Sequence, residues 1–383
     1  MISLRITPHD PVIARDGRPF NAGAGNRMRP LPFLYPSVLA GSLRTYLGKA
    51  VDPLFPPAVV NQLRATSVHG PLLADAQQLY LPRPADVLFS PDASSLHRLL
   101  PTEIGDDCGT DLPAIAGLPV MPHPPPDDNF KPGPVPAFWS LKNYTDWLTT
   151  CSLTTLPGPK PDEYAGRGYL RSLAHDVRWH VQIKADTYAA QDQRLFLTAG
   201  LALPPDMGFI ARFDSEVSPA FIPGFSPLGG ERRLAWWESG GDELWACPSA
   251  VAQSVRSAKR IRLILATPGL FRGGWLPGWL ENEEPIPGTN VRVRLRGACI
   301  DRWRAVSGYS LDRSQGKRRY GRKPIRRLVA AGAVYFLERI DHDTNESFPV
   351  ESVWLKPVSD LGQGEDVHRG AADGYGLALW GTW

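Results

Sequence analysis

The sequence predicts an α+β protein of two domains, each built from short strands and few helices. Its 383 residues are the length of two ordinary domains. Hydrophobic residues make up 43% of the chain, which is enough for packed cores. The 39 prolines are about twice the usual share. Because proline interrupts both helices and strand ladders, helical bundles and long continuous sheets are disfavoured.

The first 50 residues predict a strand, a loop and a helix. Residues Ile2–Ile6 alternate apolar and polar side chains, as a half-buried strand does. The stretch Arg15–Phe20 is rich in turn formers, which predicts a loop. In Ser37–Leu47 the apolar residues recur at helical spacing. We therefore expect an amphipathic helix with Ser37 as its N-cap and Arg44 outside the apolar stripe.

Residues 51–165 differ from the rest of the chain. They contain 20 of the 39 prolines and have a net charge of −7, from six basic and thirteen acidic residues. Since proline cannot donate to a strand ladder, we expect no central strand here. The segment is predicted to be a large, mostly irregular, proline-rich insertion on the surface of a first domain (1–245). Short helices are expected near Ala58–Leu63 and Trp139–Leu148.

Strand patterns return after residue 176. Val177–Ile183 alternates and Leu195–Leu201 follows a turn region, so the two are expected to form a hairpin. A second domain (246–383) shows the same succession of short strands and turns, with weak helix signals. Further strands are predicted at Phe209–Phe213, Leu234–Trp237, Arg260–Leu265, Val291–Arg296, Gly332–Ile340 and Leu377–Trp380.

Positive charge is concentrated in parts of the chain. The formal net charge is only +3, yet residues 251–340 hold nineteen basic and six acidic residues, and residues 1–50 hold seven and two. A local excess of this size indicates a surface that binds a polyanion. Arginine exceeds lysine by 33 to 9, and arginine makes bidentate contacts to phosphate and stacks on bases. A GC-rich genome also raises arginine content, but it does not explain the clustering.

The first candidate for nucleic-acid contact is a basic run with an aromatic residue inside it. Its glycines and proline prevent a packed helix, so we interpret it as a loop that becomes ordered on a phosphate backbone, with Tyr320 stacking on a base. The neighbouring strand places Arg292 and Arg294 on one face. A solvated loop without a ligand is the alternative. The run consists of Arg313, Lys317, Arg318, Arg319, Tyr320, Arg322, Lys323, Arg326 and Arg327.

The second candidate is the stretch Leu228–Arg233. Gly229 and Gly230 allow the backbone to approach a phosphate, and their N–H groups can donate to it. Arg232 and Arg233 would supply positive charge. An ordinary tight turn is the alternative.

The third candidate is the N-terminus of the helix that begins at Ser37. Free N–H groups and the positive end of the helix dipole favour a phosphate there. Arg15 and Arg18 precede this helix, and Arg27 and Arg29 extend the basic patch. The alternative is an ordinary capped core helix. Its leucine face is expected to be buried in the core under both interpretations.

Several stretches together resemble subunits of the RAMP superfamily in type III CRISPR effector complexes, and most closely the 5′-tag-binding subunits of the type III-B (Cmr) module. They occur in order and span nearly the whole chain outside the proline-rich segment. The matching stretches are Arg15–Phe20, Pro36–Thr45, His180–Phe196, Leu228–Arg233, Leu263–Trp275, Ser307–Tyr309, Ala330–Phe336 and Gly374–Trp380.

The resemblance implies two ferredoxin-like (RRM-type) domains with glycine-rich loops. It also implies a non-catalytic role: the subunit holds the repeat-derived 5′ end of the guide RNA and joins the large polymerase-like subunit to the backbone subunits, meeting target RNA only indirectly. The acidic segment 51–165 is expected to face protein partners, because its charge repels RNA. A protein-only scaffold is another alternative.

An enzymatic alternative is a metal-independent endoribonuclease that processes guide RNA, since relatives with that activity use histidine near a 2′-hydroxyl. The histidines here show no informative spacing, and neither a metal signature nor GxxxxGK[ST] occurs, so no cofactor is expected. The four cysteines lie at least 43 residues apart without a CxxC pair. This spacing, with no apolar run of membrane length, favours a reducing cytoplasm.

Overall fold

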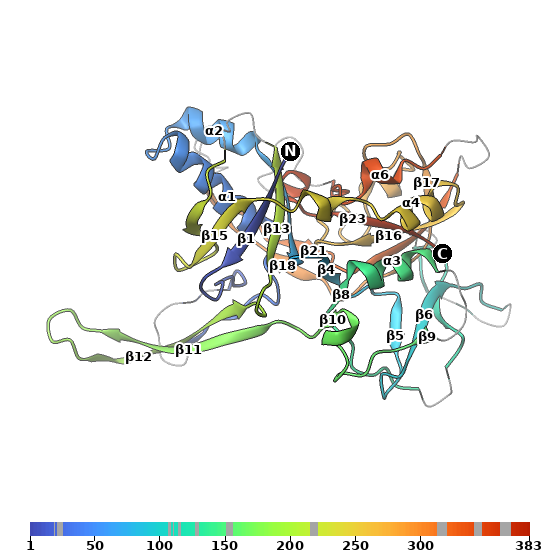
Figure 1. Cartoon of the computed structure of the whole chain (residues 1–383), viewed down its shortest axis with the longest axis horizontal. Helices are drawn as coiled ribbons and strands as arrows, with labels where there is room; N and C mark the ends of the chain where they lie inside the picture. The colour runs from blue at the N-terminus through green and yellow to red at the C-terminus, as the bar shows by residue number, and fades with distance from the viewer. Residues whose placement is uncertain are drawn as a thin grey trace. The chain divides into compact units, whose positions relative to one another are not determined.

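The computed structural model describes residues 1–18, 20, 26–105, 109, 111–113, 116–126, 130–150, 156–214, 221–311, 320–340, 347–360 and 369–383. The chain forms two compact units (Figure 1). Unit 1 comprises Met1–Pro71, Leu173–Gly240 and Ala305–Arg326, and unit 2 comprises Leu72–Ser172, Gly241–Arg304 and Arg327–Trp383. The predicted domain boundary at residue 245 stays a prediction.

Unit 1 is built on a sheet in which β1 is central. β1 pairs antiparallel with β13 on one side and β15 on the other. Leu4 and Ile6 of β1 are fully buried, with Phe209 and Trp237 of the neighbouring strands. The strand order is β3-β13-β1-β15-β14. The bounds are β1 (Ile2–Pro8), β3 (Ser67–Ala74, whose last three residues lie in unit 2), β13 (Gly208–Asp214), β14 (Gly224–Pro227) and β15 (Leu234–Ser239).

Helix α1 (Pro36–Val51) confirms the predicted amphipathic helix, because Leu39, Leu43 and Leu47 are buried. The predicted N-cap is wrong. The helix begins at Pro36, and the N-cap residue is Tyr35, which makes no side-chain capping bond. The fixed φ of proline suits the first helical position, which moves Ser37 inside the helix. Helix α2 (Pro57–Ala65) follows. No helix among the described residues is long and apolar enough to cross a membrane.

A long hairpin extends from unit 1 (Figure 1). Strands β11 (Ala174–Ile183) and β12 (Ala190–Ala202) pair antiparallel, as predicted, and are longer than the patterns that predicted them. Strand β2 (Asn26–Arg27) runs parallel to β12. A second hairpin joins β19 (Tyr309–Leu311) to β20 (Tyr320–Arg322).

Unit 2 contains a four-stranded sheet in the order β17-β22-β16-β23, with antiparallel neighbours. Helices α3 and α4 pack on β23. The core includes Trp380, Phe336 and Leu263. All four strands were predicted, with ends that shift by up to three residues. The bounds are α3 (Leu141–Thr149), α4 (Ser249–Arg256), β16 (Arg260–Leu265), α5 (Gly278–Glu281), β17 (Val293–Cys299), β22 (Val334–Arg339), α6 (Val350–Val353) and β23 (Ala378–Thr382).

The segment 51–165 is more regular than predicted. The two expected helices are present as α2 and α3, but the expectation of no central strand is wrong, because β3 lies inside a sheet. The prolines cluster in connections, so Ser67–Ala74 contains only one and is almost wholly buried. The segment also supplies β4 (Leu79–Pro82), β5 (Val87–Phe89), β6 (Ser95–Pro101), β7 (Val120–His123), β8 (Phe138–Ser140) and β9 (Leu156–Pro157).

The remaining elements are short. Strand β10 (Tyr169–Leu170) pairs with β8, and β8 pairs with β4. Strands β5, β6 and β7 form a separate sheet in that order, with β9 beside β6. Strand β18 (Arg304–Val306) pairs with β21 (Arg326–Leu328).

A buried ionic network joins helix α3 to the sheet of unit 2. Arg262 of β16 and Asp86 are both fully buried and form an ion pair. Trp147 of α3 donates its indole N–H to Asp86 at 2.9 Å, and its carbonyl accepts from Arg262. The guanidinium of Arg98 lies 3.7 Å from the Trp147 ring centroid. Because each charge has a partner, the network fixes the end of α3 without leaving an isolated buried ion.

Candidate nucleic-acid interface

Four exposed arginines gather on two adjacent stretches of unit 1. The chain around Arg15 runs antiparallel to the chain around Arg29: Arg15 bridges Pro30, and the Asp16 N–H donates to the Arg29 carbonyl at 3.1 Å. Arg27 lies two residues before Arg29 on the same stretch, in β2. We call Arg15, Arg18, Arg27 and Arg29, all exposed, the four-arginine surface.

The loop that carries Arg15 and Arg18 is held by its own side chains. Arg15 donates from Nη1 to the Arg18 carbonyl at 2.7 Å. The Arg18 N–H donates to the Asp16 carboxylate at 3.1 Å, and the Arg18 guanidinium pairs with the same group at 3.3 Å. Since 62% of the Arg18 side chain remains exposed, this ion pair leaves the guanidinium accessible to an anion.

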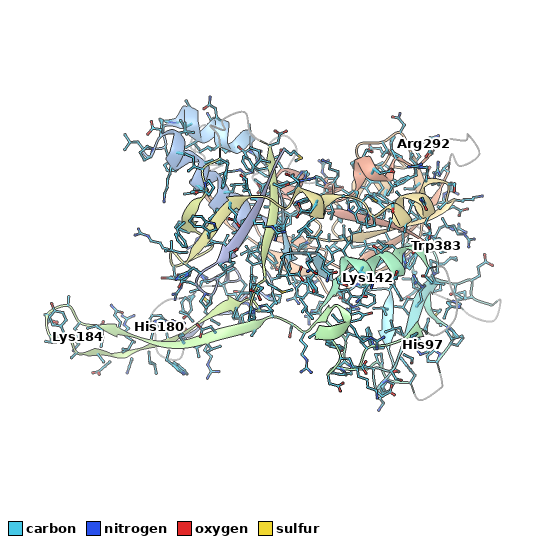
Figure 2. The ribbon with its side chains drawn as sticks, viewed as in Figure 1. His97, Lys142, His180, Lys184, Arg292 and Trp383 are labelled. Atoms are coloured by element: carbon cyan, nitrogen blue, oxygen red, sulfur yellow. The ribbon has the colours of Figure 1, made fainter. Side chains whose placement is uncertain are left out.

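An aromatic series connects this loop to the long hairpin. Phe20 packs against the cluster of Ile13, Met28 and Ala199, with the Arg15 guanidinium 5.9 Å from its ring centroid. Phe20 meets Phe196 edge-on at 5.9 Å. Phe196 in turn stacks on His180 at 5.3 Å and 15°. Figure 2 shows His180 on the hairpin, with Lys184 toward its tip.

Residue patterns alone did not mark Phe20, Phe196 and His180 as parts of this interface. The signal was present in the hairpin register, because opposed positions on paired strands put His180 and Phe196 on one face. The His180 Nε2 lies 2.8 Å from the Thr198 hydroxyl, which orients the ring.

The hairpin of β19 and β20, which we call the basic hairpin, follows a segment that contacts the Arg15 loop. A Cβ added to Gly17 would collide with Ser307, so the Arg15 loop lies directly against the segment that leads into β19. The Lys323 N–H donates to the Gly308 carbonyl at 2.8 Å. Arg322 and Arg326 are exposed and Lys323 is half-buried. Four residues of the predicted run and the side chain of Tyr320 lie outside the described part of the chain; the four are Arg313, Lys317, Arg318 and Arg319.

The predicted phosphate-binding role of the Gly229 and Gly230 N–H groups is wrong. The Gly230 N–H donates to the Ile13 carbonyl at 2.7 Å, and the Gly229 N–H donates to the Ser42 hydroxyl at 3.3 Å. Both N–H groups therefore already have an acceptor within the protein. Gly229 has φ +78°, and a Cβ there would lie 2.5 Å from the Ile13 carbonyl oxygen, so only glycine fits. The turn also carries Arg232, which is exposed, and Arg233, which is half-buried. Its Gly230 bridges Ile13, two residues before Arg15.

Arg44 and Ser37 lie on α1. The Arg44 Nη2 donates at 2.8 Å to the carbonyl of Thr66, the C-cap residue of α2. This contact gives Arg44 a structural role, because it satisfies a carbonyl at a helix C-terminus. Ser37 lies in the first turn of α1 and is partly buried.

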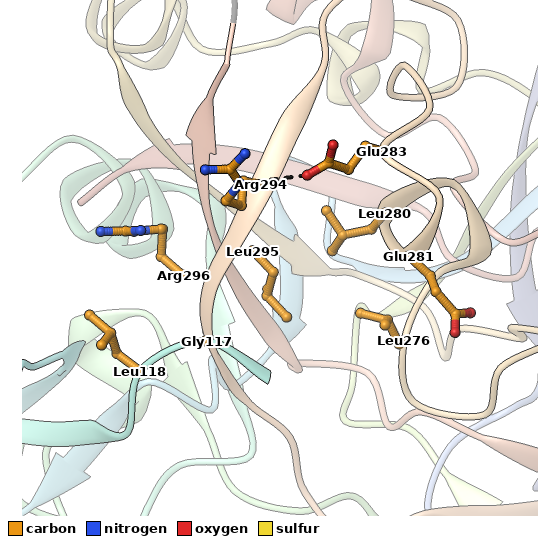
Figure 3. Close-up of a pocket in the computed structure, with 9 residues that line it drawn as sticks. All are labelled: Gly117, Leu118, Leu276, Leu280, Glu281, Glu283, Arg294, Leu295 and Arg296. Carbon is orange, nitrogen blue, oxygen red and sulfur yellow. Dashed lines mark ion pairs between the residues drawn. The ribbon is translucent and has the colours of Figure 1, made fainter. Parts of the chain in front are cut away.

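The remaining predicted residues belong to unit 2. Arg292 and Arg294 are exposed and alternate with buried aliphatic residues, which confirms the expected half-buried basic strand. Arg294 lies 3.6 Å from Glu283, on the edge of a pocket of about 420 Å³ (Figure 3). Arg296 pairs with Glu338 at 3.2 Å, so this face is partly neutralised. Arg327 lies over the ring of Trp303.

Four of the described histidines have side chains engaged in hydrogen bonds. Ring nitrogens of His97, His123, His175 and His180 each lie within 3.1 Å of a backbone carbonyl or a threonine hydroxyl. Within the ranges that the structure describes, no group of three or more histidine, cysteine or acidic side chains could hold a metal ion.

Two cysteines of unit 2 have thiols that stay protonated at neutral pH. Burial, assisted by Glu351, raises the pKa of Cys247 to about 12. Burial also raises the pKa of Cys299 far above its usual range. Because the thiolate is the nucleophile, we expect neither residue to react with iodoacetamide at pH 8 in the folded protein, and both to react in urea. Peptide mass mapping checks this, and an adduct on native Cys247 would contradict it.

The many strands and few helices define a mixed α/β protein. Its exposed arginines, beside half-buried aromatic rings, form a surface suited to nucleic acid. The family model described as CRISPR-associated protein (Cas_Cmr3) matches residues 4–383, and the chain belongs to this family. The resemblance to Cmr-type RAMP subunits, read from the motifs, is thereby confirmed. No curated protein matches the chain.

Solved structures show a more distant likeness. A chain of a structure described as the type III-B Cmr-beta bound to cognate target RNA is 14% identical, with 87% of this chain and 86% of that chain covered and a TM-score of 0.48. A chain of a Csm3-Csm4 subcomplex of the type III-A interference complex is 9% identical, with 88% and 92% covered and a TM-score of 0.37. The family assignment rests on the match over residues 4–383.

Proposed function

We propose that this chain is the RNA-binding subunit of a type III-B CRISPR effector complex that holds the repeat-derived 5′ tag of the guide RNA. The observation that carries the proposal is the four-arginine surface, together with the aromatic series that ends in Phe196 and His180. Guanidinium groups neutralise phosphates, and ring faces accept unpaired bases, so the two in combination suit a single-stranded RNA end.

We further propose that the subunit bridges the large polymerase-like subunit and the backbone RAMP subunits in the cytoplasm, with target RNA reached only through the guide. The net charge of −7 in residues 51–165 supports a protein-facing role for that segment, because like charge disfavours RNA. Basic and acidic parts of the chain would then serve different partners.

We infer that both main sheets are ferredoxin-like. In unit 1, β1, β3, β13 and β15 lie in the spatial order second, third, first, fourth. In unit 2, β16, β17, β22 and β23 lie in the same order. This order is expected when two β-α-β units interlock in one antiparallel sheet. In the described parts of the unit 2 crossovers, the α-helices are α5 and α6, four residues each, which agrees with the weak helix signals of this half of the chain.

The basic hairpin supplies a direct test of tag binding. We expect the chain with alanine at Lys317, Arg318, Arg319, Arg322 and Lys323 to bind a tag-containing guide more weakly, and with a shallower dependence on salt. For single-stranded RNA, removing one cation that neutralises a phosphate lowers the slope of log K against log salt by about 0.7. Fluorescence anisotropy across salt concentrations, with neighbouring subunits present, measures both quantities. An unchanged affinity and slope would remove this hairpin from the interface.

We also propose that the subunit is non-catalytic. To test this, the chain is incubated with a repeat-containing transcript in EDTA, and cleavage of the RNA is measured on a denaturing gel. The RNA is expected to remain intact. Site-specific cleavage that disappears when His180 or His175 is replaced by alanine would instead favour a metal-independent endoribonuclease.

A further inference from the structure

Unit 2 exposes a tryptophan beneath an arginine. Trp303, which precedes β18, is 51% exposed, whereas most of the twelve tryptophans are buried or half-buried. The Arg327 guanidinium, from the paired strand β21, lies 5.0 Å from the Trp303 ring centroid. A cation over one face of an indole restrains the ring, and the exposed remainder is open to another planar group.

The surroundings of Trp303 are cationic. Arg302 and Arg304 flank it and are exposed. The acidic residue of this stretch, Asp301, is paired with Arg83 at 3.2 Å and is thereby neutralised. Neither Arg302 nor Arg304 has a carboxylate partner among the residues that the structure describes. One guanidinium thus lies over the indole, two exposed arginines flank it in the sequence, and the one acidic residue of the stretch is already paired.

From this arrangement we propose that Trp303 is a stacking site for an unpaired RNA base, with Arg302, Arg304 and Arg327 contacting the adjoining phosphates. The proposal rests on the proposed function, since it assigns a second contact to the same RNA. Trp303 would hold the base by its ring face, which is a contact that tolerates any base identity.

A protein partner is the competing occupant, because tryptophan and arginine are also common in protein interfaces. Energetically important interface tryptophans lie in well-packed pockets that exclude water. Here the five consecutive residues 301–305 are all exposed, and the excess charge is positive. This combination of charge and open surroundings favours a polyanionic strand over a protein.

The test is the affinity of the full chain for a fluorescently labelled, single-stranded, tag-containing guide RNA, measured by anisotropy across salt concentrations. We expect W303A to weaken binding about tenfold with an unchanged salt slope, because stacking involves no counterion release. We expect W303F to retain most of the affinity. The double variant R302A/R304A should lower the slope by about 1.4.

Arg260 provides a matched control for Arg327. Its guanidinium lies 4.9 Å from the ring of Trp383, in the same unit, so R260A also removes one arginine stacked on one tryptophan. We expect R327A to weaken RNA binding and R260A to leave it unchanged.

The outcomes separate this site from the proposed function. Wild-type affinity in W303A, while the unaltered chain binds the guide, overturns the stacking site and leaves the proposed function standing. No binding by the unaltered chain or its assembled complex overturns both. If W303A releases a protein subunit from the complex but binds RNA normally, Trp303 is a protein contact and the inference is wrong.

Discussion

Alanine at all four positions of the four-arginine surface is expected to weaken binding of the tag-containing guide by roughly 100-fold to 1,000-fold at about 0.1 M salt. Each of the four arginines contributes about 0.7 to the slope of log K against log salt, and binding extrapolated to 1 M salt should be nearly unaffected. The reason is that the four side chains are exposed on adjacent stretches, where one RNA strand can meet them together. Anisotropy titrations at several salt concentrations measure the affinity and the slope.

The control for this variant removes four exposed cations elsewhere. Alanine at Lys131, Arg167, Arg256 and Lys259 lowers the net charge of the protein by the same amount, and all four side chains are exposed. If the two variants show the same decrease in affinity, total charge rather than the four-arginine surface governs binding.

Replacing Asp86 by asparagine is expected to destabilise unit 2 by about 3–5 kcal/mol. The substitution preserves the shape of the side chain and removes the charge that compensates the fully buried Arg262. A buried guanidinium without an anionic partner keeps its desolvation cost and loses the attraction that offset it. Urea unfolding, followed by tryptophan fluorescence, measures the change in the free energy of unfolding.

Two further variants make this stability prediction specific. Asp301→Asn breaks the ion pair with Arg83, in which the aspartate is 57% exposed, and should change the free energy of unfolding by less than about 1 kcal/mol. Combining Asp86→Asn with Arg262→Met removes both charges and should recover part of the stability. Equal effects of Asp86→Asn and Asp301→Asn would contradict the role given to the buried network.

The strands of the main sheets were predictable because each has a strong periodic pattern. In β1, alternation correctly places Leu4 and Ile6 in the core, but it fails at the start of the strand, where Ile2 is exposed and Ser3 is buried. The strand β3 was missed because its surroundings are rich in proline, and composition over a long segment hides a short buried stretch. Whether a proline falls in a strand or in a connection depends on tertiary pairing, which a local pattern does not contain.

The sequence predicted which charged residues of the candidate site are exposed, but it did not predict the hydrogen bonds of the site. The arginines near residues 15–29 are exposed as a basic patch requires. The N–H groups of Gly229 and Gly230 were assigned to phosphate, but they bind Ile13 and Ser42, which are distant in sequence. Trp303 was equally hidden, because its meaning depends on Arg327 from the paired strand.

The most direct test of tag binding is photocrosslinking of a guide that carries 4-thiouridine at single positions of its tag, in the assembled complex, with the attached peptides identified by mass spectrometry. Tag binding by the four-arginine surface predicts crosslinks to peptides that contain Arg15–Arg29 and the β11–β12 hairpin around His180. Crosslinks from the tag that fall only on other subunits, with none on unit 1 of this chain, would contradict it.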